Sequence, residues 1–183
     1  MQALASEHVV YAGTASKSLV PGLRLAWLVL PGRLVDDVVG AKEARGMLTS
    51  SLDQLTLSEF IASGAYDRQV RRARLAYRRR RDRLVATLRQ RAPHVEVAGI
   101  AAGLHALVRL GPGANEDDVV ASALQHGLAS QGLRAFCADG HHQGPALVVG
   151  YATPPGHLFT AAVARLCAVL SDTAAVQRAR PGR

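Results

Sequence analysis

The sequence predicts an α/β protein in two parts, on three observations. Residues 8–12 and 23–30 are short apolar and β-branched runs on either side of a polar turn, as in paired strands. An arginine-rich segment at residues 67–90 has the length of a long helix and is ended by Pro93. After Pro93, glycine-separated apolar runs predict two strands, a helix, two strands and a helix, which is an α/β sandwich.

The first part, residues 1–90, is expected to contain two strands and three helices. Pro31 and Gly32 end the second strand, and apolar residues then recur at helical spacing from Leu34 to Leu48. A second helical segment covers residues 55–65, and Asp67 is a candidate N-cap for the long helix.

The second part, residues 91–172, is expected to be a small lobe. Its strands are predicted at residues 95–99, 103–110, 133–137 and 146–152. Helices are predicted at residues 119–129 and 156–170, the first of them preceded by Asn115 as N-cap. Residues 173–183 lack apolar periodicity and are expected to form a disordered tail.

The composition excludes several classes of protein. No stretch has the ~18 unbroken apolar residues of a membrane span, so a soluble, cytoplasmic protein is expected. Cys137 and Cys167 are far apart and predict free thiols, with neither a disulfide framework nor a metal site. The net charge of +8 permits an anionic partner without establishing one.

Residues 11–31, YAGTASKSLVPGLRLAWLVLP, carry the candidate chemistry. Lys17 lies in a turn of small residues between two predicted strands, and Arg24 opens the second strand. A buried or partly buried lysine can lose its proton and attack an aldehyde. Hydroxyls, backbone amides and an arginine fork are suitable donors to a phosphate dianion. The segment therefore has both functions that a pyridoxal phosphate site needs.

This segment resembles the cofactor-lysine signature of class I and II aminotransferases, in which Ser-Lys is followed by proline and by an arginine that opens an apolar strand. GTASKSLVPGLRLAWLVLP is more closely similar to the MocR-type branch of GntR regulators. These regulators have a DNA-binding winged helix and a C-terminal aminotransferase-like domain. The runs DRQVRRARLAYRRRRDRLVATL, GLHALVRL and LVVGYA extend the resemblance over about residues 8–170.

The resemblance implies the C-terminal portion of a pyridoxal-phosphate-dependent transferase of fold type I. Residues 1–90 would be the end of its large domain, and residues 91–172 its small lobe. Lys17 would attach the cofactor covalently as the catalytic residue, Arg24 would bind its phosphate, and Thr14 and Ser16 would donate hydrogen bonds. Alanine stands at Ala26, where the family usually has glycine.

The upstream elements of the family site are not found before Lys17. These are an aspartate paired with the pyridine nitrogen, an aromatic ring stacked on the cofactor and a glycine-rich phosphate loop. Glu7 is the one acid that precedes Lys17. Without a carboxylate on the pyridine nitrogen the cofactor is a poorer electron sink, so the chain alone is expected to be a weak catalyst or none. We also expect it to associate with itself or with a complementing N-terminal piece.

The substrate carboxylate has no clear binding residue in this sequence. Aminotransferases commonly hold it with an arginine of the small lobe, yet residues 146–153 contain none. Arg109 and Arg134 are substitutes, although ordinary strand-end charges explain them better.

Three other features are interpreted as structural. His105 is expected to be a packed histidine rather than an acid-base catalyst, and Trp27 a core residue. His141 and His142 lie in a glycine-flanked loop without partners at metal-ligand spacing.

The arginines of the long helix allow two interpretations. At 3.6 residues per turn they surround most of the helix and leave Val70, Ala73, Leu75, Tyr77, Leu84 and Leu88 to pack inward in part. A solvated face or a dimer contact is favoured over direct contact with nucleic acid phosphates.

Three functions remain open from the sequence. The first is the ligand-sensing domain of a MocR-type regulator, a homodimer that binds pyridoxal phosphate and an amine or amino acid, and that contacts DNA through a separate N-terminal domain. The second is an aminotransferase that moves amino groups between amino and keto acids. The third is a non-catalytic remnant that only dimerises. The resemblance in the arginine-rich helix favours the first.

Overall fold

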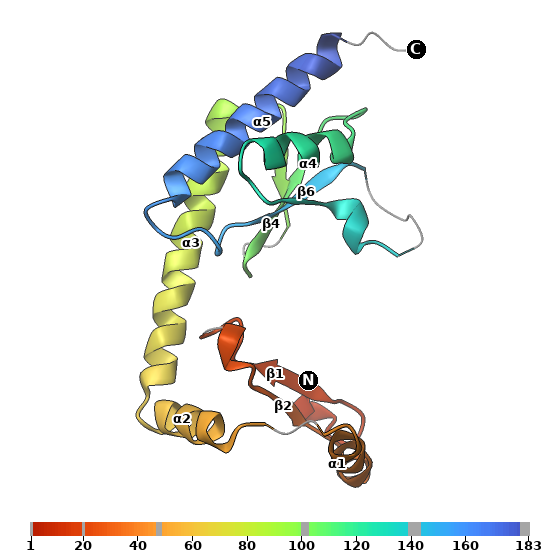
Figure 1. Cartoon of the computed structure of the whole chain (residues 1–183), viewed down its shortest axis with the longest axis vertical. Helices are drawn as coiled ribbons and strands as arrows, with labels where there is room; N and C mark the ends of the chain where they lie inside the picture. The colour runs from red at the N-terminus through yellow and green to blue at the C-terminus, as the bar shows by residue number, and fades with distance from the viewer. Residues whose placement is uncertain (1, 20, 47–48, 100–102, 139–143, 180–183) are drawn as a thin grey trace. The chain divides into compact units, whose positions relative to one another are not determined.

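The computed structural model describes residues 2–19, 21–46, 49–99, 103–138 and 144–179 and confirms a mixed α/β architecture (Figure 1). The chain divides into two compact units, Met1–Arg74 and Leu75–Arg183. One sheet belongs to each unit: a two-stranded sheet to the first and a four-stranded sheet to the second.

An antiparallel hairpin organises the first unit. Its strands are β1 (Tyr11–Thr14) and β2 (Ala26–Val29), with Tyr11 opposite Val29. Both strands differ from the expected ranges. Backbone amides at residues 8 and 9 bond to the carbonyl of Ala5, so that segment forms a turn. Pro21 lacks an amide donor and begins a short 3-10 helix, η2 (Pro21–Leu23), before β2.

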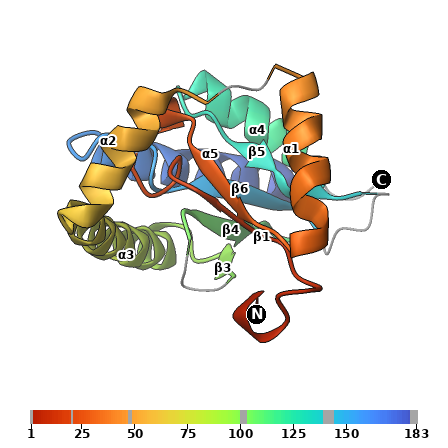
Figure 2. The ribbon, with the colours of Figure 1, turned by 90° about the horizontal axis from the view of Figure 1, so that it is seen from below.

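Helices surround this hairpin. They are η1 (Gln2–Leu4), η3 (Gly32–Leu34), α1 (Val35–Ala44), α2 (Ser51–Ala62) and the start of α3 (Ala65–Arg91). Figures 1 and 2 show α1 and α2 on opposite sides of the hairpin. α2 begins earlier than expected because the hydroxyl of Ser50 accepts the amide of Asp53 at 3.3 Å and caps the helix.

The first unit buries little apolar surface. All four residues of β2 are exposed, and Trp27 is 37% exposed, so its expected place in a core is wrong. Its indole covers Gly13 across the hairpin, where any Cβ would collide with the ring. Such a two-stranded ribbon with apolar residues on both faces lacks the neighbours that stabilise a sheet.

The second unit has the expected order of two strands, a helix, two strands and a helix. Its antiparallel sheet has the order β3-β4-β6-β5. The strands are β3 (Glu96–Ala98), β4 (His105–Arg109), β5 (Gln131–Gly132) and β6 (Ala146–Gly150). The strand expected at residues 133–137 is instead the 3-10 helix η4 (Leu133–Phe136). The reason is that the backbone amide of Arg134 donates to the carboxylate of Glu116 and therefore cannot donate to a neighbouring strand.

Two helices, α4 (Glu116–Gln125) and α5 (Phe159–Ala179), pack together beside the sheet (Figure 1). The core gathers apolar side chains from α3, the sheet and both helices, including Leu84, Leu88, Val108, Val119, Leu147, Val163, Leu166, Val169 and Leu170. Asn115 caps α4 as expected, accepting the amide of Asp117 at 3.0 Å. α5 continues to Ala179, through alanine-rich sequence that favours helix, in the segment expected to be disordered.

The buried carboxylate of Glu116 connects three elements of this unit. It accepts the amide of Ala146 on β6 at 2.8 Å and the amide of Arg134 on η4 at 3.1 Å. A Cβ on Gly132 would collide with this carboxylate, so glycine is required there.

Three findings concern the described part of the chain. None of its helices is long and apolar enough to cross a membrane. None of its histidine, cysteine and acidic side chains form a group of three that could hold a metal ion. Cys137 and Cys167 are free thiols.

Candidate cofactor site

The turn that contains Lys17 closes over the end of the β1–β2 hairpin. The amide of Ala15 donates to the carbonyl of Leu25 at 3.0 Å, directly after the strand pair Thr14 and Ala26. Ala15 is 0% exposed and Leu25 is 4% exposed, so this closure is the buried point of the unit. The turn leaves the hairpin after Ala15 and rejoins it at Leu25. Lys17 and Arg24, which both belong to this turn, therefore lie at the same end of the hairpin.

Hydroxyl groups hold the turn from within. Thr14 Oγ1 donates to the carbonyl of Leu25 at 3.1 Å and accepts the amide of Ser16 at 3.1 Å. Ser18 Oγ donates to the carbonyl of Ala15 at 3.4 Å. The donor of Thr14 is thus engaged within the turn, whereas the hydroxyl of Ser16 has no hydrogen-bond partner among the described residues.

Arg24 has a strained backbone. It is the one non-glycine residue of the described chain with positive φ, at 49°. Residues with a Cβ rarely adopt this left-handed backbone region, because it costs them about 1–2 kcal/mol of conformational energy. The side chain of Arg24 is exposed, and no ion pair holds it among the described residues. A strained, unpaired arginine next to a lysine turn is a candidate anion-binding residue.

Lys17 is exposed at the centre of the turn. The chemistry expected from the sequence needs a buried or partly buried amine, and the described residues do not bury this one. The turn therefore presents the amine without enclosing it.

Tyr66, at the start of α3, is a part of the site that the sequence analysis missed. Its hydroxyl donates to Ser18 Oγ at 3.0 Å and so ties α3 to the lysine turn. The two residues are 48 positions apart, and no local pattern connects them. Thr14, Ser16, Lys17 and Arg24, in contrast, are close in sequence and lie at the same end of the hairpin.

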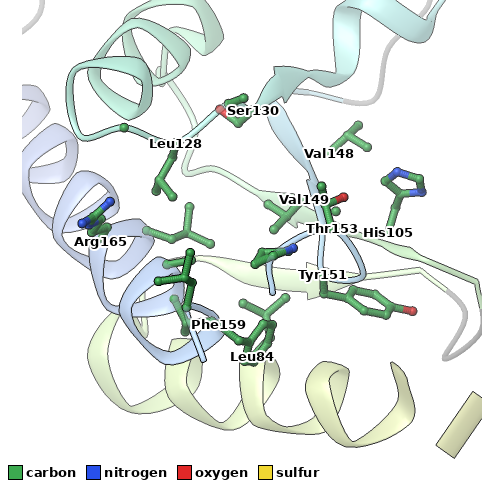
Figure 3. Close-up of a pocket in the computed structure, with 18 of the residues that line it drawn as sticks. Leu84, His105, Leu128, Ser130, Val148, Val149, Tyr151, Thr153, Phe159 and Arg165 are labelled. Atoms are coloured by element: carbon green, nitrogen blue, oxygen red, sulfur yellow. The ribbon is translucent and has the colours of Figure 1, made fainter. Parts of the chain in front are cut away.

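A separate cavity of about 800 Å³ lies in the second unit (Figure 3). Its walls are mainly apolar, with Val148 and Val149 of β6, Leu128, and Phe159 of α5 among them. Figure 3 shows His105 and Arg165 on opposite sides of it. Ser130 also lines the cavity, and its buried Oγ has no hydrogen-bond partner.

The expected roles of the small-lobe residues are only partly met. His105 is exposed at the cavity rather than packed, because the opposite residue on β6 is Gly150. Arg134 forms an ion pair with Asp117 at 2.5 Å, and neither Arg134 nor Arg109 lines the cavity. His141 and His142 lie outside the described residues.

The donor set of the turn fits part of a pyridoxal phosphate site. A primary amine can bind the aldehyde, an unpaired guanidinium suits the phosphate, and the hydroxyl of Ser16 is free to donate. The described residues of the first unit offer these groups on a turn held by five internal hydrogen bonds.

Comparison with known proteins relates the chain to transcriptional regulators and to aminotransferases. No family model matches the chain. An uncharacterized HTH-type transcriptional regulator of Bacillus subtilis, YhdI, is 34% identical over 122 residues, which are 66% of this chain and 26% of the regulator. The probable rhizopine catabolism regulatory protein MocR of Rhizobium meliloti is 33% identical over 121 residues, 66% of this chain and 24% of that protein.

A solved structure gives the same indication. LysN, an α-aminoadipate aminotransferase of Thermus thermophilus in complex with N-(5'-phosphopyridoxyl)-L-leucine, matches with a TM-score of 0.84 and 26% identity. The match covers 94% of this chain and 45% of LysN.

This chain spans about a quarter of the length of the regulators and less than half of the aminotransferase. The fold is that of the fold-type-I, pyridoxal-phosphate-dependent aminotransferases, as expected. The chain is therefore a homologue of the MocR-type HTH regulators of the GntR family and of the aminotransferases.

Proposed function

We propose that this chain is a pyridoxal-phosphate-binding, aminotransferase-like effector domain of a MocR-type transcriptional regulator. The observation that carries the proposal is the closed turn at the end of the hairpin, which presents an amine and an unpaired guanidinium on one short segment. The similarity to regulators and to an aminotransferase solved with a phosphopyridoxyl ligand supports it.

Lys17 would hold the cofactor through its ε-amine. Arg24 would bind the phosphate, since its planar fork can donate two parallel hydrogen bonds. Ser16 would add a hydroxyl donor, and Thr14 would contribute chiefly by fixing the amide of Ser16. When bound, pyridoxal phosphate supplies an electrophilic aldehyde and an electron-withdrawing ring.

The regulator is preferred to an enzyme on one comparison. The first relatives reported are HTH-type regulators at 33–34% identity, whereas the aminotransferase is 26% identical. An amine or amino acid would be the ligand that the regulator senses, in a cytoplasmic homodimer. Class I/II aminotransferase activity is the alternative function.

Spectroscopy separates these functions. We expect the chain to change the absorbance of pyridoxal phosphate on binding and to lose that change when inorganic phosphate competes. Addition of amines or amino acids should then shift the spectrum without turnover. Catalytic formation of a keto acid, with 2-oxoglutarate as acceptor, would instead establish the enzyme. A cofactor spectrum unchanged by the protein would contradict both.

A further inference from the structure

The positive charge of the chain is concentrated on one helix. α3 contains 11 of the 22 basic residues and two of the 14 acidic residues. The formal charge of this helix is therefore +9, against +8 for the whole chain, so the remaining residues are close to neutral. A general arginine bias in the composition would have spread the charge over all elements.

One arginine of α3 in the second unit has a structural role. Arg80 donates to the carbonyls of Tyr151 at 3.4 Å and Ala152 at 2.9 Å, and its guanidinium lies 5.5 Å from the centre of the Phe159 ring. Arg80 thus fixes the segment between β6 and α5.

Five other arginines of α3 in this unit are exposed: Arg78, Arg79, Arg83, Arg89 and Arg91. At 100° per residue the first four fall within one side of the helix, opposite the buried Leu84, whereas Arg91 falls on the side of Leu84. We call these four residues the arginine face. Asp82 is the one acid of α3 on this side of the helix, and the ion pair between Arg134 and Asp117 lies elsewhere.

The arginine face differs from an ordinary solvated helix face. Solvated faces mix both signs of charge, with opposite charges three or four residues apart. Here Asp82 is the one opposite charge, four residues after Arg78 and three after Arg79, whereas Arg79 and Arg83 are like charges at i and i+4 that repel each other. A polyanion would relieve this repulsion, and release of its counterions would favour binding.

The length of the arginine face suits a nucleic acid backbone. From Arg78 to Arg89 the helix rises about 16 Å, at ~1.5 Å per residue. Duplex DNA carries a phosphate every ~3.4 Å along each strand, so this span faces about five phosphates. Arginine forks bind phosphate oxygens through paired hydrogen bonds.

We propose that the arginine face of α3 binds the phosphate backbone of duplex DNA without reading sequence. The effector domain would then contact the DNA backbone in addition to the sequence-specific contacts made by an HTH domain. The choice of DNA among polyanions rests on the proposed function, whereas the anionic chemistry of the partner rests on the charges of α3.

Fluorescence anisotropy with a labelled duplex of arbitrary sequence, over a range of salt concentrations, tests the proposal. The 183-residue chain is compared with the variant R78Q/R79Q/R83Q, because glutamine keeps helix propensity and removes charge. R33Q/K42Q/R45Q is the matched control, since it loses the same formal charge from exposed residues of the first unit. R78K/R79K/R83K keeps the charge and removes the fork.

We expect R78Q/R79Q/R83Q to bind at least about tenfold more weakly near 0.1 M salt. It should also lower the slope of log affinity against log salt by about 2.7, which is ~0.9 for each lost phosphate contact. The control should change the slope by less than about 1, and the lysine variant should keep most of the slope.

Several results would overturn the proposal. One is a loss of DNA affinity in the control variant as large as in R78Q/R79Q/R83Q, and another is a loss in the lysine variant as large as in the glutamine variant. The proposal would also fail if the chain bound polyglutamate more strongly than duplex DNA, or if R78Q/R79Q/R83Q changed sedimentation without changing DNA affinity. Circular dichroism establishes that each variant is folded. Cofactor attachment at Lys17 is measured separately, so failure of this inference leaves the proposed function intact.

Discussion

Substitution of Arg24 separates two properties that the structure combines in one residue, a strained backbone and a free guanidinium. At φ 49°, arginine and alanine both have the steric cost of the left-handed region, about 1–2 kcal/mol, and glycine does not. Glycine loses about 0.5–1 kcal/mol through the entropy of the unfolded chain. Arg24→Gly should therefore be more stable than Arg24→Ala by about 0–1.5 kcal/mol.

The loss of cofactor affinity should follow the guanidinium and not the backbone. Both Arg24→Ala and Arg24→Gly remove the proposed phosphate donor, at about 2–4 kcal/mol, which is roughly 30-fold to 1000-fold in affinity. Arg24→Lys should recover only part of the affinity, because an ammonium lacks the planar fork.

The assay is a pyridoxal phosphate titration of all four proteins, followed by absorbance, with thermal unfolding measured without cofactor. Equal affinity in all four would refute the phosphate role. Normal affinity in Arg24→Gly with a loss in Arg24→Ala would show that the backbone, and not the side chain, matters for binding.

Three further predictions concern stability and association. Glu116→Ala leaves a buried backbone amide without its acceptor and should lower the free energy of unfolding by about 2–4 kcal/mol in a urea titration; an unchanged midpoint would contradict the role of this carboxylate. Burial raises the pKa of the Cys167 thiol and of the Tyr151 phenol. The folded state therefore keeps both groups neutral at pH values at which they ionise in the unfolded chain. The stabilisation is complete below about pH 8.5 and is lost as the pH rises toward the folded pKa values, and a urea midpoint that stays constant from pH 7 to 10 would be inconsistent with it. Leu28→Lys places a charge on the exposed hairpin and should reduce self-association in sedimentation velocity, whereas an unchanged monomeric boundary in both proteins would mean that the hairpin does not associate.

The sequence predicted the elements of the second unit well because apolar periodicity and helix caps are local signals. Asn115 and the acids that follow it marked the start of α4 correctly. The exception at residues 133–137 has a long-range cause, since Glu116 removes the amide of Arg134 from the ladder. The residues next to Arg134 in the sequence do not indicate its contact with Glu116, which is 18 positions away.

The first unit was predicted less well for a similar reason. Apolar runs at residues 8–12 and 23–30 indicated full strands, but local turns and Pro21 shorten both. The lysine turn itself was found, since Lys17 and Arg24 are close in sequence. The positive φ of Arg24 and the bond from Tyr66 to Ser18 depend on tertiary structure and could not be predicted from residue types.

Reductive trapping of the cofactor tests the central claim most directly, because the chain contains two lysines, Lys17 and Lys42. Both are exposed, so Lys42 is an internal control for non-specific labelling. The chain is treated with borohydride in the presence of pyridoxal phosphate, or of pyridoxal without phosphate, and the labelled lysines are mapped by mass spectrometry. We predict that pyridoxal phosphate labels Lys17 in preference to Lys42, and that the preference falls with pyridoxal and in Arg24→Ala. Equal labelling of the two lysines by pyridoxal phosphate, or preferential labelling of Lys42, would contradict the account.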